Sequence, residues 1–244
     1  MATNEDTNHR DPHPYIHQEH HPQPMSHDII KYYRDRAKEY EQVYEWRDPH
    51  RQQEQNRLGE EIKQTFRNLN VLDIGCGTGY WTQKTGMTAH RITGIDINEA
   101  VLEIARSKKY SCPTEFKTMD AYDMRFPPNT FTGALATFWL SHVRIEDVDD
   151  WIEHMHGVLA PGARVFIADN TYIEGVGGRL VTREGDTNTF KLRTLNDGSQ
   201  HLVVKNYYTA GELLELFSRH TGGVKAGDVF HGRCFWWINY RLEK

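Results

Sequence analysis

Apolar residues recur along the chain with two alternating periods, one typical of strands and one typical of helices. Short apolar runs of strand length are separated by stretches in which apolar residues return every third or fourth position. Strands are predicted at residues 71–74, 91–95, 114–118, 131–138 and 163–168, and helices at residues 52–68, 99–107, 147–158 and from Tyr80 onward. Strands that alternate with helices form βαβ units. The pattern therefore predicts an α/β fold with a parallel sheet.

The chain before this alternation divides into two parts. In residues 27–44, apolar and aromatic side chains lie on one helical face, which predicts a helix in front of the sheet domain. Residues 1–26 have no periodic apolar face and hold five histidines among four prolines. We expect a disordered His/Pro-rich leader that binds metal ions at most incidentally, because irregularly spaced histidines give no fixed geometry.

The alternation loosens after Asp169. Residues 170–188 are rich in glycine and charge and are expected to form a loop. Two strands, at residues 189–195 and 201–207, are expected around the turn at residues 196–198. Thr209 is placed to cap a helix that runs to Arg219, and residues 234–240 predict a last, aromatic strand.

Composition and charge exclude several classes of function. The 244 residues carry a net charge of −5, so a nucleic-acid partner is not expected. No apolar run approaches the roughly 20 residues of a membrane helix, and the first residues lack a secretory signal pattern. The three cysteines, Cys76, Cys112 and Cys234, are odd in number and widely spaced, which favours a reducing, cytoplasmic location and no metal site.

The segment from Asp73 to Tyr80 is the most informative in the chain. Its glycines follow the spacing G-x-G-x-G directly after a predicted strand, so that the main chain can turn sharply and approach a ligand closely. A dinucleotide-binding loop would have a third glycine where Tyr80 stands, and its pyrophosphate would be repelled by Asp73. This combination disfavours a nicotinamide cofactor and favours a ligand with a cationic amino acid portion.

Two further acids follow the next predicted strands. Asp96 ends the second strand, where a carboxylate can accept hydrogen bonds from ribose hydroxyls, and Ile97 is placed to pack on an adenine ring. Asp120, followed by Ala121, comes after the third strand and is placed to accept a hydrogen bond from the adenine amino group. Ordinary helix capping is the alternative role for both acids.

Together these segments resemble class I S-adenosylmethionine-dependent methyltransferases. Residues 71–79 are similar to the first motif of that family, residues 94–96 to its second, residues 120–121 to its third, and Pro161-Gly162 to its post-catalytic motif. The resemblance covers roughly residues 32–170. Two departures concern the acceptor side, because Thr132 replaces a common acid and Ser141-His142 stands where many members carry Glu-His.

The resemblance implies a fold, a cofactor and a binding site. It implies a Rossmann-like, doubly wound, mostly parallel seven-stranded sheet whose last strand is antiparallel, in a domain of residues 27–244. Residues 27–50 would form a helical lid, although its tyrosines are equally explained as the core side of an amphipathic helix. The implied cofactor is S-adenosyl-L-methionine. The residues implied to bind it are Tyr33, Tyr40, Asp73, Gly75, Cys76, Gly77, Asp96, Ile97, Asp120, Ala121 and Phe138.

Methyl transfer from a sulfonium requires mainly the alignment of nucleophile, methyl group and sulfur. His142 is the candidate catalytic base, since an imidazole titrates near neutrality, and packing against the cofactor is its alternative role. Asn170, Tyr172 and Tyr207 are candidate substrate contacts.

The predicted function is methyl transfer to an O, N or C nucleophile of a small-molecule acceptor. Protein or RNA methylation, and a catalytically silent S-adenosylmethionine-binding protein, are the alternatives. The sequence leaves the acceptor and the oligomeric state open.

Overall fold

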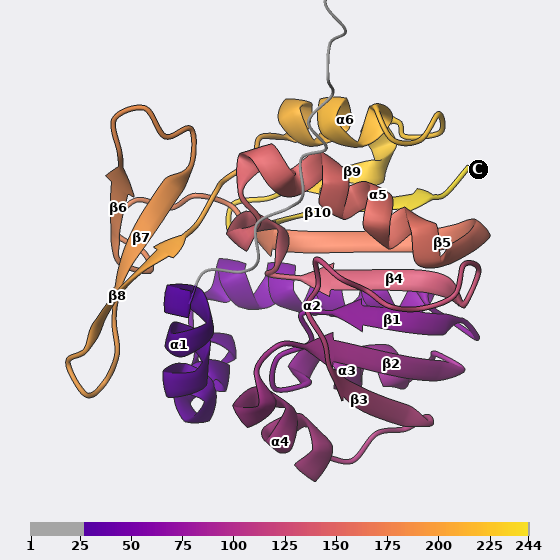
Figure 1. Cartoon of the computed structure of the whole chain (residues 1–244), viewed down its shortest axis with the longest axis horizontal. Coiled ribbons are helices and arrows are strands. Elements are labelled where there is room, and N and C mark those ends of the chain that lie inside the picture. The colour runs from indigo at the N-terminus through magenta and orange to yellow at the C-terminus, as the bar shows by residue number, and fades with distance from the viewer. Residues whose placement is uncertain (1–26, 244) are drawn as a thin grey trace, which may run out of the picture.

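The computed structural model describes residues 27–243 (Figure 1). The predicted leader at residues 1–26 lies outside this range. Among the described residues, no helix combines the length and the apolar character needed to cross a membrane. The three cysteines are all free thiols.

A seven-stranded sheet forms the centre of the structure, with the strand order β3-β2-β1-β4-β5-β10-β9. Strands β1 to β5 are parallel, whereas β10 runs antiparallel to both β5 and β9. The prediction of a mostly parallel sheet whose last strand is antiparallel is therefore confirmed. The strands are β1 (Asn70–Ile74), β2 (Arg91–Asp96), β3 (Thr114–Thr118), β4 (Phe131–Thr137), β5 (Leu159–Asn170), β9 (Val229–His231) and β10 (Phe235–Arg241).

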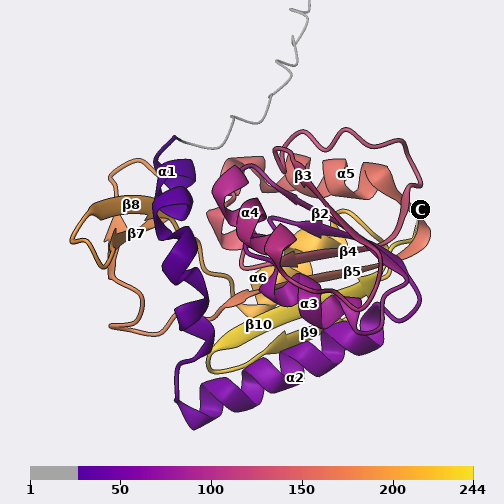
Figure 2. The ribbon, with the colours of Figure 1, turned by 90° about the horizontal axis from the view of Figure 1, so that it is seen from below.

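Helices cover both faces of this sheet (Figure 2). Helix α2 lies along one face with α3, and α5 and α6 cover the other, while α4 packs beside β2 and β3. The helices are α1 (His27–Arg36), the 3₁₀ helix η1 (Ala37–Tyr44), α2 (Pro49–Thr65), α3 (Tyr80–Gly86), α4 (Glu99–Ser107), α5 (Val148–Val158) and α6 (Ala210–Ser218).

Strand β5 contributes side chains to the hydrophobic cores on both faces of the sheet. Val165 and Ile167 are buried in the cluster under α5 and α6, whereas Phe166 and Ala168 are buried in the cluster under α2. Successive side chains of a strand point to opposite faces, so a strand covered on both sides must be apolar throughout. This explains the continuous apolar runs of the sequence.

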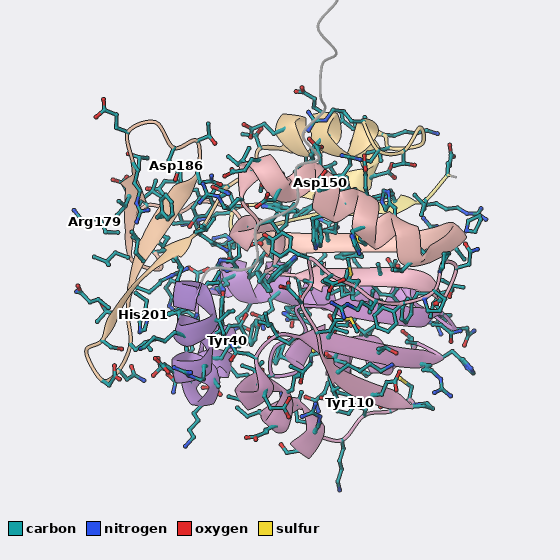
Figure 3. The ribbon with its side chains drawn as sticks, in the orientation of Figure 1. Tyr40, Tyr110, Asp150, Arg179, Asp186 and His201 are labelled. Carbon is teal, nitrogen blue, oxygen red and sulfur yellow. The ribbon has the colours of Figure 1, made fainter. Side chains whose placement is uncertain are left out.

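A second sheet projects from the body between β5 and α6 (Figure 1). Its strands β6 (Arg179–Thr182), β7 (Thr189–Thr194) and β8 (Gln200–Val204) are all antiparallel. It packs against α1, where Tyr32 and His201 place their ring centroids 5.5 Å apart, and Figure 3 shows His201 at this junction. We call this unit the inserted sheet. The expectation of a loop over residues 170–188 is wrong for β6, because pairing with β7 outweighs the glycines and charges around it.

Three other boundaries also differ from the predictions. The single helix expected at residues 27–44 changes from α to 3₁₀ at Ala37. Helix α2 begins at Pro49, earlier than expected, because the Asp48 side chain accepts a hydrogen bond from the backbone N–H of Arg51 at 2.8 Å. The strand expected at residues 163–168 begins earlier, at Leu159, and its first residues are irregular because the register to β4 shifts there. Strand β9 was not predicted.

Candidate functional site

The loop from β1 to α3 presents bare main chain at the carboxyl edge of the sheet. Gly75 and Gly77 have φ angles of +63° and +53°, in the left-handed region that other residues rarely adopt. A Cβ atom on Gly75 would lie 3.1 Å from the Trp139 ring, so a larger residue there would have to displace that ring. A Cβ on Gly77 would meet no atom within 4 Å. The loop is therefore tight on one side and open on the other.

Asp96 connects this loop to the end of β2. Its Oδ2 accepts a hydrogen bond from the Gly77 backbone N–H at 3.0 Å, and its Oδ1 accepts one from the Asn98 N–H at 2.9 Å. Burial raises the pKa of the Asp96 carboxyl to about 6, although both hydrogen bonds oppose the rise. The carboxyl group is therefore ionised at neutral pH and held against the open side of the glycine loop.

Asp73 lies in β1 beneath the same loop and is fully buried. Its Oδ2 accepts a hydrogen bond from the Thr82 hydroxyl at 2.6 Å, but its Oδ1 has no hydrogen-bond partner among the described residues. Burial raises the pKa of this carboxyl to about 7. A buried acceptor without a partner is costly in a folded chain, so this oxygen suits a ligand that brings a hydrogen-bond donor or a positive charge.

The third acid lies at the end of the neighbouring strand. The Met119 N–H donates to the Asp96 carbonyl at 3.0 Å, which brings the end of β3 beside that of β2. Asp120 Oδ1 accepts a hydrogen bond from the nearby Tyr122 N–H at 2.9 Å. Ile97 is half-buried and Ala121 is buried. The acids predicted from the sequence thus share one edge of the sheet, and their roles toward a nucleoside stay predictions.

The 3₁₀ helix η1 is fastened to this edge by a contact that the sequence did not indicate. Glu41 accepts a hydrogen bond from the Thr78 hydroxyl at 2.5 Å and forms an ion pair with Lys108 of the segment after α4. No local pattern marks Glu41, because its partners lie 37 and 67 residues away. The contact holds η1 against the glycine loop, and the role of residues 27–50 as a lid stays a prediction.

Tyr33 and His142 meet where α1 approaches the end of β4. His142 Nδ1 lies 2.6 Å from the Val204 carbonyl oxygen, which can only accept, so this nitrogen carries the proton. Its Nε2, 2.6 Å from the Tyr33 oxygen, therefore accepts a hydrogen bond from the Tyr33 hydroxyl. Burial, together with the charge of Lys205, lowers the pKa of His142 to about 3. The imidazole is thus neutral, and its lone pair is engaged by Tyr33 in this state.

A cavity of about 820 Å³ lies between the lid, the ends of β4 and β5, and the inserted sheet. Six residues predicted for the site line it: Tyr33, Tyr40, Phe138, His142, Asn170 and Tyr207. Tyr172 does not line the cavity; it is 42% exposed and contacts Tyr207 with ring centroids 5.2 Å apart. The predicted glycines and acids do not line it either, so the cavity lies beside the glycine loop rather than over it.

A buried ion pair forms part of the cavity wall. Lys205 Nζ lies 2.7 Å from Asp169 Oδ1 and 2.6 Å from Ser141 Oγ. Burial opposes the ionisation of Asp169, but the charge of Lys205 outweighs it and holds the pKa of this carboxyl below its usual value. Burial lowers the pKa of Lys205. The cluster sits where β5 ends and fixes the inserted sheet to the main one.

Comparison with known proteins identifies a methyltransferase domain in the central part of the chain. Residues 71–162 match the family model described as a methyltransferase domain. O-methyltransferase cnsE of Penicillium expansum is 32% identical over 53% of this chain and 51% of its own length. O-methyltransferase rstn1 of Aspergillus nomiae is 34% identical over 51% of this chain and 60% of its own length. Residues 71–162 therefore form a methyltransferase domain. The chain spans about half the length of these curated relatives.

Solved structures share the fold of this methyltransferase domain over most of the chain. The DhpI complex with SAH has a TM-score of 0.67 at 24% identity and covers 90% of this chain and 100% of DhpI. The [4+2]-cyclase SpnF has a TM-score of 0.59 at 22% identity and covers 86% of this chain and 76% of its own. Sequence identity below 25% shows only that the fold is shared. The description of SpnF as a cyclase shows that this fold hosts different chemistries.

The unpaired carboxyl of Asp73 predicts a stability that depends on pH. Because burial raises its pKa from 3.8 to about 7, the folded chain loses stability as the pH rises through this range and the group ionises. Asp73→Asn carries no charge and should raise the free energy of unfolding of the ligand-free domain by about 1–3 kcal/mol at pH 8. Urea unfolding measures this difference, which should shrink toward pH 5.

Asp123→Asn is the matched control, because Asp123 is an exposed partner of Arg125. It should change the stability little at either pH. A loss of stability in Asp73→Asn at pH 8, or a gain that does not depend on pH, would contradict the assignment of a buried, unpaired carboxylate.

Proposed function

We propose that this chain transfers a methyl group from S-adenosylmethionine to an oxygen, nitrogen or carbon nucleophile of a small-molecule acceptor. The observation that carries the proposal is the buried, partnerless oxygen of Asp73 beneath open main chain at Gly77, with the Asp96 carboxylate beside it. This arrangement offers hydrogen-bond acceptors for a ribose and for an ammonium group around one loop. S-adenosylmethionine carries both groups and has no pyrophosphate to be bound by the main chain.

The residues present fit this cofactor along its length. Asp96 binds the ribose hydroxyls, and Asp120, Ile97 and Ala121 surround the adenine, with Cys76 filling the loop behind it. Asp73 faces the methionine ammonium. The carboxylate of the cofactor's methionine portion pairs with Arg51. This arginine is 8% exposed, lines the cavity and has a buried Nε without a hydrogen-bond partner among the described residues.

The bound cofactor supplies a methyl group activated by the sulfonium charge. The chain orients the acceptor along the line of the departing sulfur, and excludes water. The lid tyrosines, Tyr33 and Tyr40, and Phe138 at the end of β4 line the cavity, where aromatic faces stabilise a sulfonium through cation–π contact. The lid therefore serves both to close the site and to stabilise the charge that is lost on transfer.

His142 is proposed as the base for acceptors that carry a proton, although the expectation that it titrates near neutrality is wrong for the ligand-free chain, where burial and the charge of Lys205 lower its pKa to about 3. An acceptor hydroxyl would take the place of the Tyr33 hydroxyl on Nε2, while the Val204 carbonyl keeps the ring in the required tautomer. Asn170 and Tyr207 line the same cavity and are proposed substrate contacts. Tyr172 would act only through its contact with the Tyr207 ring.

The cavity favours a small molecule over a macromolecule. It is bounded by the lid on one side and by the inserted sheet on the other, and about 820 Å³ suits a single ring system or a short chain. The names of the relatives, O-methyltransferases, favour oxygen as the nucleophile. A cytoplasmic location and the absence of a nucleic-acid partner are supported by the free thiols and the negative net charge.

The cofactor assignment predicts a binding preference. Calorimetry should show S-adenosylhomocysteine bound in the micromolar range and NADH not bound. Asp96→Ala should weaken S-adenosylhomocysteine binding by about 1–3 kcal/mol, since a buried ribose would lose its acceptor. Asp123→Ala, at an exposed carboxylate, is the control and should bind normally. NADH binding in place of S-adenosylhomocysteine would overturn the proposal, and unchanged affinity would remove Asp96 from the site.

The role of His142 can be separated from that of Tyr33. Tyr33→Phe removes their hydrogen bond but leaves the imidazole lone pair free, whereas His142→Gln removes the group that accepts a proton. We expect His142→Gln to lower kcat at least tenfold more than Tyr33→Phe does, with similar S-adenosylhomocysteine affinity in both variants. Steady-state kinetics and calorimetry provide the comparison. Equal effects on kcat would restrict His142 to holding the lid.

A further inference from the structure

The charges that line the cavity are mostly positive. Its basic residues are Arg36, Arg47, Arg51, Arg193 and Lys205, and its acidic ones are Glu39 and Glu45. The chain as a whole has a net charge of −5. The positive lining is therefore a local feature of the cavity and does not follow from the overall composition.

Arg36 enters the cavity from the lid without an acidic partner. Its Nη1 donates a hydrogen bond to the Tyr32 hydroxyl at 2.8 Å, and its guanidinium lies over the Tyr40 ring at 5.1 Å from the centroid. No carboxylate of the described residues lies within 4.0 Å of it, although the group is half-buried. Its neighbours orient the guanidinium but leave its charge unbalanced.

Arg193 enters from the opposite side, on β7 of the inserted sheet. One guanidinium nitrogen donates to the Gly177 carbonyl, and its Nε is buried without a hydrogen-bond partner in the described part of the chain. It too lies beyond ion-pair distance of every described carboxylate. A buried donor with neither a partner nor a counter-charge is costly unless a ligand supplies one.

The charges of Arg36 and Arg193 affect the same two groups, Tyr33 and Lys205. Burial raises the pKa of Tyr33 well above its usual value, and the charges of Arg36 and Arg193 both oppose that rise. Both charges also add to the effect of burial in lowering the pKa of Lys205. Both arginines line the same cavity as Tyr33, His142 and Lys205, so a bound anion would offset mutual repulsion among the three cations.

We propose that Arg36 and Arg193 together bind an oxyanion of the methyl acceptor, a carboxylate or a phosphoryl-type group, beside the Tyr33–His142 pair. The planar donors of a guanidinium match both groups with paired hydrogen bonds. The proposal names the acceptor class for the methyl transfer proposed above and rests on it. The carboxylate of the cofactor itself is assigned to Arg51, which packs on the Phe235 ring at 4.6 Å and belongs to α2 rather than to either of these elements.

The first test measures which probes the wild-type chain binds. Aromatic and aliphatic carboxylic acids, the corresponding phosphonic acids, and the neutral primary amide of each carboxylic acid are compared by calorimetry, with and without S-adenosylhomocysteine. At least one acid should bind at least tenfold more tightly than its amide. The carboxylic and phosphonic arms identify which oxyanion the site prefers. If no acid exceeds its amide tenfold, the proposal is overturned.

The second test removes each guanidinium in turn. Arg193→Gln and Arg36→Gln should each weaken binding of the best acid at least tenfold while the amide and S-adenosylhomocysteine bind as before. Arg193→Lys should keep part of the affinity, because it retains the charge without the paired donors. Arg179→Gln in the inserted sheet and Arg34→Gln in α1 are matched controls, since both side chains are exposed and neither lines the cavity; Figure 3 shows Arg179 directed away from the body.

Two results would overturn the assignment of the arginines. One is acid binding that survives in both Gln variants. The other is an equal loss of S-adenosylhomocysteine affinity, which would mean that these arginines serve the cofactor. Acid binding without any S-adenosylhomocysteine binding in the wild-type chain would refute the proposed methyl transfer alone, whereas the reverse would refute only the oxyanion site.

Discussion

The hydrogen bond from the Gly77 N–H to the Asp96 carboxylate is the contact on which the cofactor half of the structure depends. It fixes the glycine loop of β1 against the end of β2, and this is possible only because parallel strands end at the same edge of the sheet. Burial of Asp96 and of Asp73 beneath it raises the pKa of both carboxyl groups. The edge thus holds acids that are unfavourable in the empty fold, and ligand binding would compensate for that cost.

The acceptor half is built by different means. The lid and the inserted sheet meet through Tyr32 and His201, and the Lys205–Asp169 ion pair joins the inserted sheet to the end of β5. Acids concentrate at the glycine loop and cations around the cavity. A cationic cofactor and an anionic acceptor would each enter a region of opposite charge, so the arrangement of charge orients the two reactants relative to each other.

The sequence predicted the cofactor half well because its signals are local. Glycine spacing, acids directly after strands and apolar runs are all contained within about 50 residues, and the five central strands lie where periodicity places them. The acceptor half was predicted only in part, since β7, β8 and six cavity residues were expected but β6 and the unpaired arginines were not. Strand β6 is recognisable only once it pairs with β7. Arg36 and Arg193 line one cavity only because α1 packs against β8, which lies 160 or more residues further along the chain. An unpaired charge is a property of three-dimensional surroundings, which no window of sequence contains.

The inserted sheet enters and leaves the domain between β5 and α6, so its strands are added to the fold without interrupting the order of the main sheet. Substitutions in the inserted sheet do not change the ends of β1, β2 and β3, where the glycine loop and the predicted acids lie. They can therefore alter the wall of the cavity without changing the sheet edge that holds the glycine loop.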